Sequence, residues 1–441
     1  MKKVLLFLCV FAMCVPFLMA EGQMEPSSDY PKEDLVLDED GCASNPWAVE
    51  LADDELVMWS LFGGGDGNFL DQMVRKYNAT NPAYRVKVVK LQWGSYYTKL
   101  MTAVAAKKGP DIGVCHVSKL PEMVDNGAVV PLDAFAAKAG LDWSSLNPNN
   151  VESTTFYGEK YAVPLDTHAE VLFYNKDLVE KAGMLNEDGT ITIENNVDQF
   201  DAFMGKLRDN LPEGYTAMSF PQKGDEPWRL WWIFYFQMGG ERFISEDGTT
   251  FTLDKEKAVT ALKYVNSWYE KGFTPSNLEG FVKYFQSGKG ATFLGGVWCT
   301  GIFEQDPDMN FGVMEVPCLF GKKANWGDSH TLVLPMKKKR DDAKSKAAVE
   351  FLKFVSEEGA TWAKAGHIPA NLEVFNSQEF KELPYRSDYI KVADTVVYFG
   401  NSPDNWTIKS LMIEDIEAYL NNLKTAEEAI DSMEEQISAL F

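Results

Sequence analysis

The chain has 441 residues, long enough for two or more domains, and 45% of them are hydrophobic, so a full core can form. Its 65 acidic residues outnumber the 42 lysines and arginines and leave a formal charge of -23. Such a surface repels the phosphates of nucleic acids and anionic lipids, so neither is an expected partner. Beyond that exclusion, the charge indicates only solubility.

The N-terminus has the pattern of a secretory signal peptide. A basic Met-Lys-Lys start precedes the apolar run VLLFLCVFAMCVPFLMA, which ends at Ala20. Pro16 interrupts this run, and no later segment has the ~18 unbroken apolar residues of a membrane helix. We therefore expect residues 1–20 to direct export to the periplasm or cell envelope. A lipid anchor at Cys14 is an alternative, although FAMC matches a bacterial lipobox poorly.

Four cysteines remain after the signal peptide, namely Cys42, Cys115, Cys299 and Cys318. They form no CxxC pair, which disfavours a zinc ribbon or a thioredoxin-type site. An oxidising compartment allows disulfides, but the sequence does not determine a pairing.

The first half of the ordered chain alternates between predicted strands and helices. Residues 21–52 are acidic and predict a flexible leader. A strand is expected at Glu55–Ser60, followed by the loop LFGGGDGN and a helix that Asp66 or Asn68 caps and Pro82 stops. The segments YRVKVVKLQ, YYTKLMTAVAAKKG and DIGVCHV then predict strand, helix and strand. This order predicts an α/β fold with a parallel sheet, which binds ligands where loops leave the carboxyl ends of its strands.

A second body is expected within residues 175–320. DEPWRLWWIFYFQMGG and DKEKAVTALKYVNSWYEKG predict helices, and FQSGKGATFLGGVWCTG predicts a helix end, a strand and a turn. Three further elements are predicted after it. They are a strand in HTLVLPMKKK, a helix in AKSKAAVEFLKFVSEEGATWAKAG and a closing amphipathic helix in TAEEAIDSMEEQISALF. Between the two bodies, YAVPLDTHAEVLFYNKDL is strand material interrupted by Asp166, Thr167 and His168. Either this is an edge strand with a wet turn, or the chain crosses between bodies at a binding site.

Several stretches, in the family's order, resemble family 1 extracellular solute-binding proteins, the sugar-type receptors of bacterial ABC importers. They are KKGPDIGVCHVSKLPEMVDNGAVVPLDAF, GEKYAVPLDTHAEVLFYNKDLVEKAG, FQSGKGATFLGGVW, WGDSHTLVLP, AAVEFLKFV, GHIPAN and TAEEAIDSMEEQI. The resemblance covers about residues 55–441. It implies a periplasmic-binding-protein-like fold, with two α/β lobes, multiple hinge crossings and a cleft between the lobes. Lobe one takes residues 53–165 and 322–370, and lobe two takes 166–321 and 371–441.

A sugar site combines polar side chains with flat aromatic rings, and the chain has 12 tryptophans. Trp93 and His116 follow predicted strands at their carboxyl ends, where a capping aromatic and a surface histidine are the alternatives. Trp298 and Trp326 lie beside glycines that allow close approach of a ligand. The candidate ligand-binding residues are Asp66, Trp93, His116, Asp166, His168, Trp228, Trp232, Trp298, Trp326, Asp328 and His330.

Two of these candidates lie on a predicted helix. Trp228, Trp231, Trp232 and Tyr235 follow i, i+3, i+4, i+7 spacing and share one face. This spacing favours core packing in lobe two, while the preceding loop GDEP leaves room for one ring to reach a solute.

Other kinds of site lack a signature. His116, His168, His330 and His367 are scattered without an H-x3-H pair, so no metal is expected. GGGDG lacks the G-x-G-x-x-G spacing and no G-K-[ST] occurs, so no phosphate-bearing cofactor is expected. No G-x-S-x-G or known Cys–His pattern indicates catalysis.

The residues and the resemblance together predict a non-enzymatic receptor without a cofactor. It is expected to be a monomer that captures a mono- or oligosaccharide and delivers it to an ABC transporter permease. One alternative is a secreted carbohydrate-active enzyme, and another is a receptor for a non-sugar solute such as a polyamine or a sugar phosphate. The arginines are dispersed, which gives no support to a phosphate site.

Overall fold

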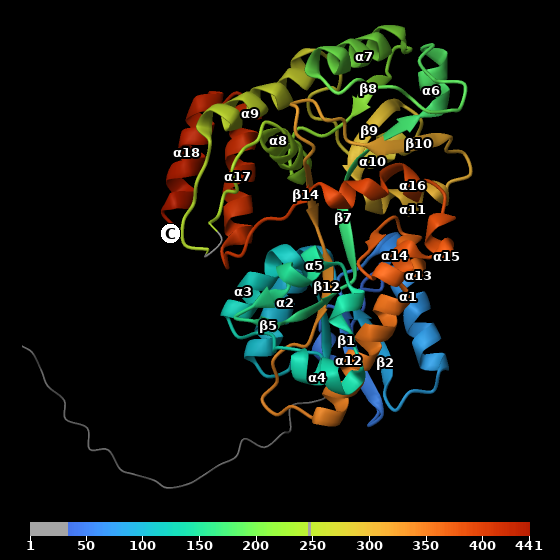
Figure 1. The fold of residues 1–441 in the computed structure, drawn as a ribbon, viewed down its shortest axis with the longest axis vertical. Coiled ribbons are helices and arrows are strands. Elements are labelled where there is room, and N and C mark those ends of the chain that lie inside the picture. The colour runs from blue at the N-terminus through green and yellow to red at the C-terminus, as the bar shows by residue number, and fades with distance from the viewer. Residues whose placement is uncertain (1–33, 246–247) are drawn as a thin grey trace, which may run out of the picture. The chain divides into compact units, whose positions relative to one another are not determined.

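Two β-sheets organise the computed structural model, which describes residues 34–245 and 248–441 (Figure 1). The first sheet has the order β2-β1-β3-β12-β6, and the second has the order β14-β11-β7-β9-β8, with β10 and β13 also paired to β7. The strands of the first sheet are β1 (Glu55–Ser60), β2 (Arg85–Lys90), β3 (Ile112–His116), β6 (Ala162–Pro164) and β12 (His330–Val333). Those of the second are β7 (Asp166–Asn175), β8 (Thr216–Ser219), β9 (Gly290–Gly296), β10 (Phe311–Glu315), β11 (Asn325–Asp328), β13 (Ile368–Pro369) and β14 (Val396–Val397).

The first sheet is mixed, whereas the sequence predicts a parallel one. β1 is parallel to β2 and to β3, as expected. β12 is antiparallel to both β3 and β6. The reason is that β12 enters this sheet from the second one, so it runs opposite to the strands that the βα units build.

Helices cover the first sheet and bury one hydrophobic core, which contains residues between Ala43 and Leu165 and between Leu332 and Ala365. They are α1 (Gly64–Ala79), α2 (Trp93–Ala105), α3 (Leu120–Asp125), α4 (Asp133–Ala139), α5 (Pro148–Ser153), α12 (Asp342–Glu357) and α13 (Gly359–Ala363). A small hairpin of β4 (Thr155–Phe156) and β5 (Glu159–Lys160) precedes β6. We call this part the first lobe.

The second lobe is built on the second sheet and has cores of its own. Its helices are α6 (Lys176–Lys181), α7 (Val197–Asn210), α8 (Asp225–Gln237), α9 (Lys255–Glu270), α10 (Phe281–Gln286), α11 (Thr300–Glu304), α14 (Leu372–Asn376), α15 (Gln378–Lys381), α16 (Arg386–Tyr389), α17 (Asn405–Leu420) and α18 (Ala426–Ser438). The predicted helices at α8, α9 and α18 are confirmed. The predicted class, two α/β lobes, is also confirmed.

The chain crosses between the lobes three times. β6 continues through Leu165 into β7, β11 continues through Ser329 into β12, and the segment after α13 leads into β13. β11 lies in the second sheet, so the return crossing is at Ser329 and not at residue 322. Asp166, Thr167 and His168 begin β7, where they are buried and paired with β13 and β11. Of the two alternatives for this segment, the edge strand with a wet turn is therefore wrong, and the chain crosses between the lobes here.

The described part of the leader packs on the first lobe. Ala43 is buried in the first core, and its amide donates to the Lys90 carbonyl at 2.7 Å. Gln92 donates to the carboxylates of Asp38 and Asp40. Residues 35–52 are therefore attached to the lobe, and the expectation of a flexible leader does not hold for them. The expected signal peptide and Cys14 lie outside the described residues.

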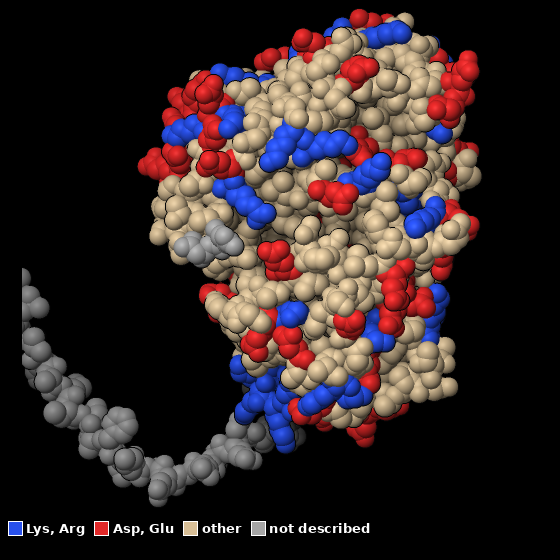
Figure 2. Space-filling view, in the orientation of Figure 1, with Lys and Arg blue, Asp and Glu red and all other residues tan. Residues whose placement is uncertain are grey.

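The surface and the cysteines add little to the site. On the face in Figure 2, acidic and basic side chains are interspersed over uncharged surface. Cys42, Cys115, Cys299 and Cys318 are buried and unpaired in the described chain. Within residues 34–245 and 248–441, no helix combines the length and the apolar character needed to cross a membrane.

Candidate functional site

A cavity of about 810 Å³ opens where the two sheets meet. This volume lies in the range of roughly 300–1,000 Å³ that small-molecule sites usually have. Its walls come from the ends of β1, β2 and β3, from the start of α1, from α8, and from all three crossings. Six predicted residues line it, namely Asp66, Trp93, His116, His168, Trp298 and His330. The sequence interpretation missed His367, Glu226 and Arg229, which also line it.

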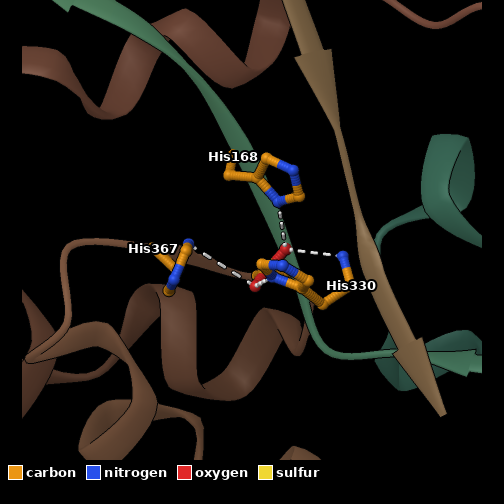
Figure 3. Close-up of side chains that lie close together, drawn as sticks. His168, His330 and His367 are labelled. Carbon is orange, nitrogen blue, oxygen red and sulfur yellow. Dashed lines mark hydrogen bonds and ion pairs between the residues drawn. The ribbon is translucent and has the colours of Figure 1, made fainter. Parts of the chain in front are cut away.

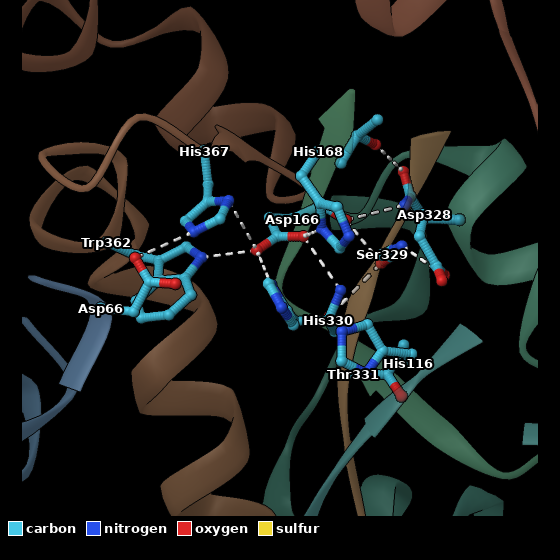
Figure 4. Close-up of polar contacts among 12 residues, drawn as sticks. Asp66, His116, Asp166, His168, Asp328, Ser329, His330, Thr331, Trp362 and His367 are labelled. Carbon is cyan, nitrogen blue, oxygen red and sulfur yellow. Dashed lines mark hydrogen bonds and ion pairs between the residues drawn. The ribbon is translucent and has the colours of Figure 1, made fainter. Parts of the chain in front are cut away.

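Asp166 joins the three crossings beneath the cavity (Figure 4). We call Asp166 and the three histidines around it, His168, His330 and His367, the floor of the cavity. The Asp166 side chain is fully buried. Its carboxylate accepts hydrogen bonds from the His330 amide at 3.0 Å and from Trp362 Nε1 at 2.6 Å. Because an ionised carboxylate only accepts, Nδ1 of His330 at 2.8 Å and of His168 at 3.1 Å donate to it. Asp166 therefore holds the crossings together and is not free to bind a sugar hydroxyl, which corrects its expected role.

All four histidines of the chain gather around this carboxylate. The ring centroids of His168 and His330 are 4.3 Å apart, and those of His116 and His330 are 4.8 Å apart. His116 Nδ1 lies 2.7 Å from Tyr97 Oη, and it either accepts a hydrogen bond from this hydroxyl or donates one to it. The scattered spacing of these residues is therefore no argument against a metal site, because the crossings bring them together.

The cluster shifts the pKa values of its members in different directions. Burial, followed by the neighbouring His330, lowers the pKa of His168 to about 4 and that of His116 well below its usual value. Burial opposes ionisation of Asp166, yet His330, His367 and the hydrogen bond from His168 hold its pKa well below the usual range. A neutral imidazole and an ionised carboxylate thus lie side by side in the floor.

His367 reaches the floor because of the glycine before it. Gly366 has φ of +123°, and a Cβ there would lie 1.9 Å from the Val297 carbonyl oxygen. No other residue fits this close approach. The His367 ring is completely buried, stacks on Trp362 with centroids 4.8 Å apart, and lies 3.3 Å from an Asp66 carboxylate oxygen. Burial would lower the pKa of His367, but Asp66 and Asp166 raise it above its usual value.

Two tryptophans form the aromatic wall of the cavity. Trp93 is 49% exposed and stacks on Trp406 with centroids 5.9 Å apart. Trp298 lies across the backbone of Gly296, where an added Cβ would be 2.0 Å from the indole ring. The space over Gly296 is therefore filled by the Trp298 ring itself, and the predicted approach of a ligand beside this glycine stays a prediction.

Arg229 of α8 lies on the same side of the cavity as Trp298 and carries a positive charge there. Its guanidinium lies over the rings of Trp326 at 4.2 Å and Trp298 at 5.0 Å. It pairs with the buried Glu170 at 3.2 Å and with Glu226 at 3.3 Å. Burial raises the pKa of Glu170 to about 7, and Arg229 opposes that rise. Asp225 also lies 3.3 Å from the guanidinium, so this one group contacts three carboxylates and two indoles.

Four predicted residues lie away from the main cavity. Trp326 is buried beneath Arg229, so its ring is not an open platform. Asp328 accepts from the amide and the hydroxyl of Ser118. Trp228 is buried, and with Trp326 and Asp328 it lines only a small adjoining space of about 50 Å³. Trp232 is buried in the core of the second lobe, as its helical spacing favours.

The comparisons with known proteins agree with this geometry. Residues 64–362 match the family described as bacterial extracellular solute-binding protein. The arabinooligosaccharide-binding protein of Bacillus subtilis is 25% identical over 80% of this chain and 81% of its own length. The maltodextrin-binding protein MdxE of the same organism is 22% identical over 85% and 88%.

Solved structures share the fold at low identity. The GacH receptor of Streptomyces glaucescens, solved unliganded and with acarbose, has a TM-score of 0.76 at 20% identity and covers 88% of this chain and 98% of its own. Maltose-bound MalE3 of T. maritima has a TM-score of 0.74 at 20% identity and covers 88% and 100%. With the family match spanning well over half of its residues, this chain belongs to the bacterial extracellular solute-binding proteins.

Proposed function

We propose that this protein is an extracytoplasmic receptor that captures a mono- or oligosaccharide and delivers it, unaltered, to an ABC transporter permease. The observation that carries the proposal is the main cavity, in which Trp93 and Trp298 share a space with Asp66, Glu226 and Arg229. The names of two relatives, which refer to arabinooligosaccharide and maltodextrin binding, support the same solute class. The receptor acts as a monomer after export by its signal peptide.

The chemistry of the cavity suits a sugar. A sugar ring has apolar C–H faces, which stack on indole rings, and a rim of hydroxyls, which bond to charged and polar groups. The indoles lie on opposite lobes, because Trp93 begins α2 and Trp298 follows β9. A solute that contacts both lobes favours the closed arrangement by its differential affinity for it.

A thermal-shift screen of the purified mature protein against mono- and oligosaccharides tests the proposal. A ligand that binds only the folded state raises the melting temperature, so at least one saccharide is expected to do so. The best hit is then incubated with the protein and analysed by chromatography. No shift with any saccharide contradicts the solute class, and protein-dependent cleavage of the hit contradicts the receptor role.

Replacement of the cavity tryptophans is expected to weaken saccharide binding. Trp93→Ala and Trp298→Ala each remove a stacking surface, which costs about 1–3 kcal/mol, or about ten- to a hundredfold in Kd. Titration calorimetry measures the change after circular dichroism confirms folding. Trp47→Ala is the matched control, because Trp47 is 47% exposed but lines a different cavity. Parental affinity in both cavity variants would place the stacking surface elsewhere.

A further inference from the structure

The histidines of the crossings and Asp166 form a group with the donors of a metal site. One ligand atom from each of Asp166, His168, His330 and His367 lies within 4.8 Å of all the others. All four residues are buried. Figure 3 shows the three imidazoles around one carboxylate, each from a different crossing.

We propose that these four residues bind one divalent transition-metal ion, with Zn²⁺ as the representative of the class. The Nδ1 atoms of His330, His168 and His367 lie 2.8, 3.1 and 3.6 Å from Asp166 carboxylate oxygens. Around a tetrahedral Zn²⁺ with bonds of roughly 2.0–2.1 Å, neighbouring ligand atoms are about 3.3 Å apart. The three histidine–carboxylate distances scatter about this value, and no two of the four donor atoms are more than 4.8 Å apart.

The kinds of donor select the class of ion. Three imidazole nitrogens and one carboxylate oxygen suit Zn²⁺, Co²⁺ or Ni²⁺, whereas Mg²⁺ and Ca²⁺ prefer oxygen ligands alone. With its three imidazoles neutral, as metal ligation requires, the donor set carries a total charge of -1, which favours a divalent cation. A ligating imidazole needs an unprotonated nitrogen. When the ion binds Nδ1 of His168 and of His330, the single proton of each neutral ring, which Nδ1 now donates to Asp166, moves to Nε2.

His367 supplies an independent indication. Both of its ring nitrogens are buried, and neither makes a hydrogen bond within the described residues. Buried polar atoms without partners are costly, and a bound cation would satisfy Nδ1. Its Nε2 lies 3.3 Å from an Asp66 oxygen, so a carboxylate lies near the ring nitrogen that would not bind the ion, where outer carboxylates of metal sites are found.

The ion has a route to the site and a structural consequence. His168, His330 and His367 also line the main cavity, so an ion reaches them from the cleft without unfolding of either lobe. Because each histidine comes from a different crossing, the ion would bind the three crossings to one another. Binding of the ion is therefore expected to raise the free energy of unfolding of the protein.

The test uses the untagged mature protein after treatment with a chelator. Titration calorimetry with Zn²⁺ is expected to give about one ion per chain and a raised melting temperature, while Mg²⁺ gives neither. Co²⁺ in place of Zn²⁺ is expected to show the strong visible absorption of a four-coordinate ion. Absence of stoichiometric Zn²⁺ binding overturns the proposal, as does an octahedral Co²⁺ spectrum with parental affinity in the variants.

Variants identify the donors. His367→Gln and His168→Gln are each expected to weaken Zn²⁺ binding at least about tenfold. His116→Gln is the matched control, because His116 lies in the same cluster but outside the donor group, and it should leave the Zn²⁺ affinity unchanged. Parental affinity in both donor variants, or an equal loss in the control, refutes this donor set. Saccharide titration of the metal-free protein is recorded separately, so failure of the metal site leaves the receptor proposal to its own test.

Discussion

Asp166→Ala is expected to lower the free energy of unfolding by about 3–5 kcal/mol, the largest effect of any single polar substitution near the cleft. The variant removes the acceptor for the His330 amide, Trp362 Nε1 and two imidazoles, all in a buried floor. These donors would remain without partners and without water. The three crossings would also lose their common attachment, so we expect loss of saccharide binding along with stability.

Urea unfolding of the metal-free protein, followed by tryptophan fluorescence, measures this change. Asp142→Ala is the matched control, because Asp142 also accepts from a backbone amide and a hydroxyl but does so at the surface. It should have little effect. Asp166→Asn keeps the shape and some acceptor capacity, so its cost should fall between those of Asp166→Ala and the parent. A cost below about 1 kcal/mol for Asp166→Ala would show that Asp166 does not join the crossings energetically.

Local pattern was sufficient to predict much of the fold. The apolar run Glu55–Ser60 is β1, and the helical spacing of its tryptophans places α8 correctly. The pattern failed at Asp166–His168, where three polar residues looked like a break between strands. They continue into β7, because partners from β11, β12 and α13 satisfy them in the interior. Those partners lie far away in sequence, and no local pattern reports them.

The site was predictable where a rule of the fold applies. Trp93 and His116 follow parallel strands, and both line the cavity as that rule predicts. His367 had only one signal, the preceding Gly366, and it required knowing that Val297 approaches from the other lobe. Arg229 was hidden among dispersed arginines. Asp225 and Glu226 on its own helix give only an ordinary helical ion-pair spacing, and its buried partner Glu170 is on a different element. Long-range contacts between the crossing segments therefore determine which side chains lie at the bottom of the cavity, and residue spacing in the sequence does not show these contacts.

The Arg229–Glu170 pair is the second place where one substitution should have a large effect. Glu170 is completely buried and Arg229 nearly so, and the two lie 3.2 Å apart. Arg229→Met keeps much of the apolar stem that covers Trp326 but removes the charge. Removing one partner of a buried pair leaves the other uncompensated, which costs roughly 3–5 kcal/mol. We expect the destabilisation at the lower end of that range, because a proton on Glu170 relieves part of the cost.

A double-mutant cycle separates this pair from simple packing loss. Glu170→Gln in the Arg229→Met background removes the unpaired carboxylate, so it should recover at least about 1 kcal/mol, giving a coupling energy of about 1–3 kcal/mol. The same cycle on Lys263 and Glu427, an ion pair at 2.6 Å on the exposed surface, should give a coupling close to the measurement error. Urea unfolding of the parent, which both cycles share, and of the six variants supplies the seven free energies. If the Arg229–Glu170 coupling were no larger than the surface one, the guanidinium would stabilise this wall by packing on Trp298 and Trp326, and the carboxylate would have no part in it.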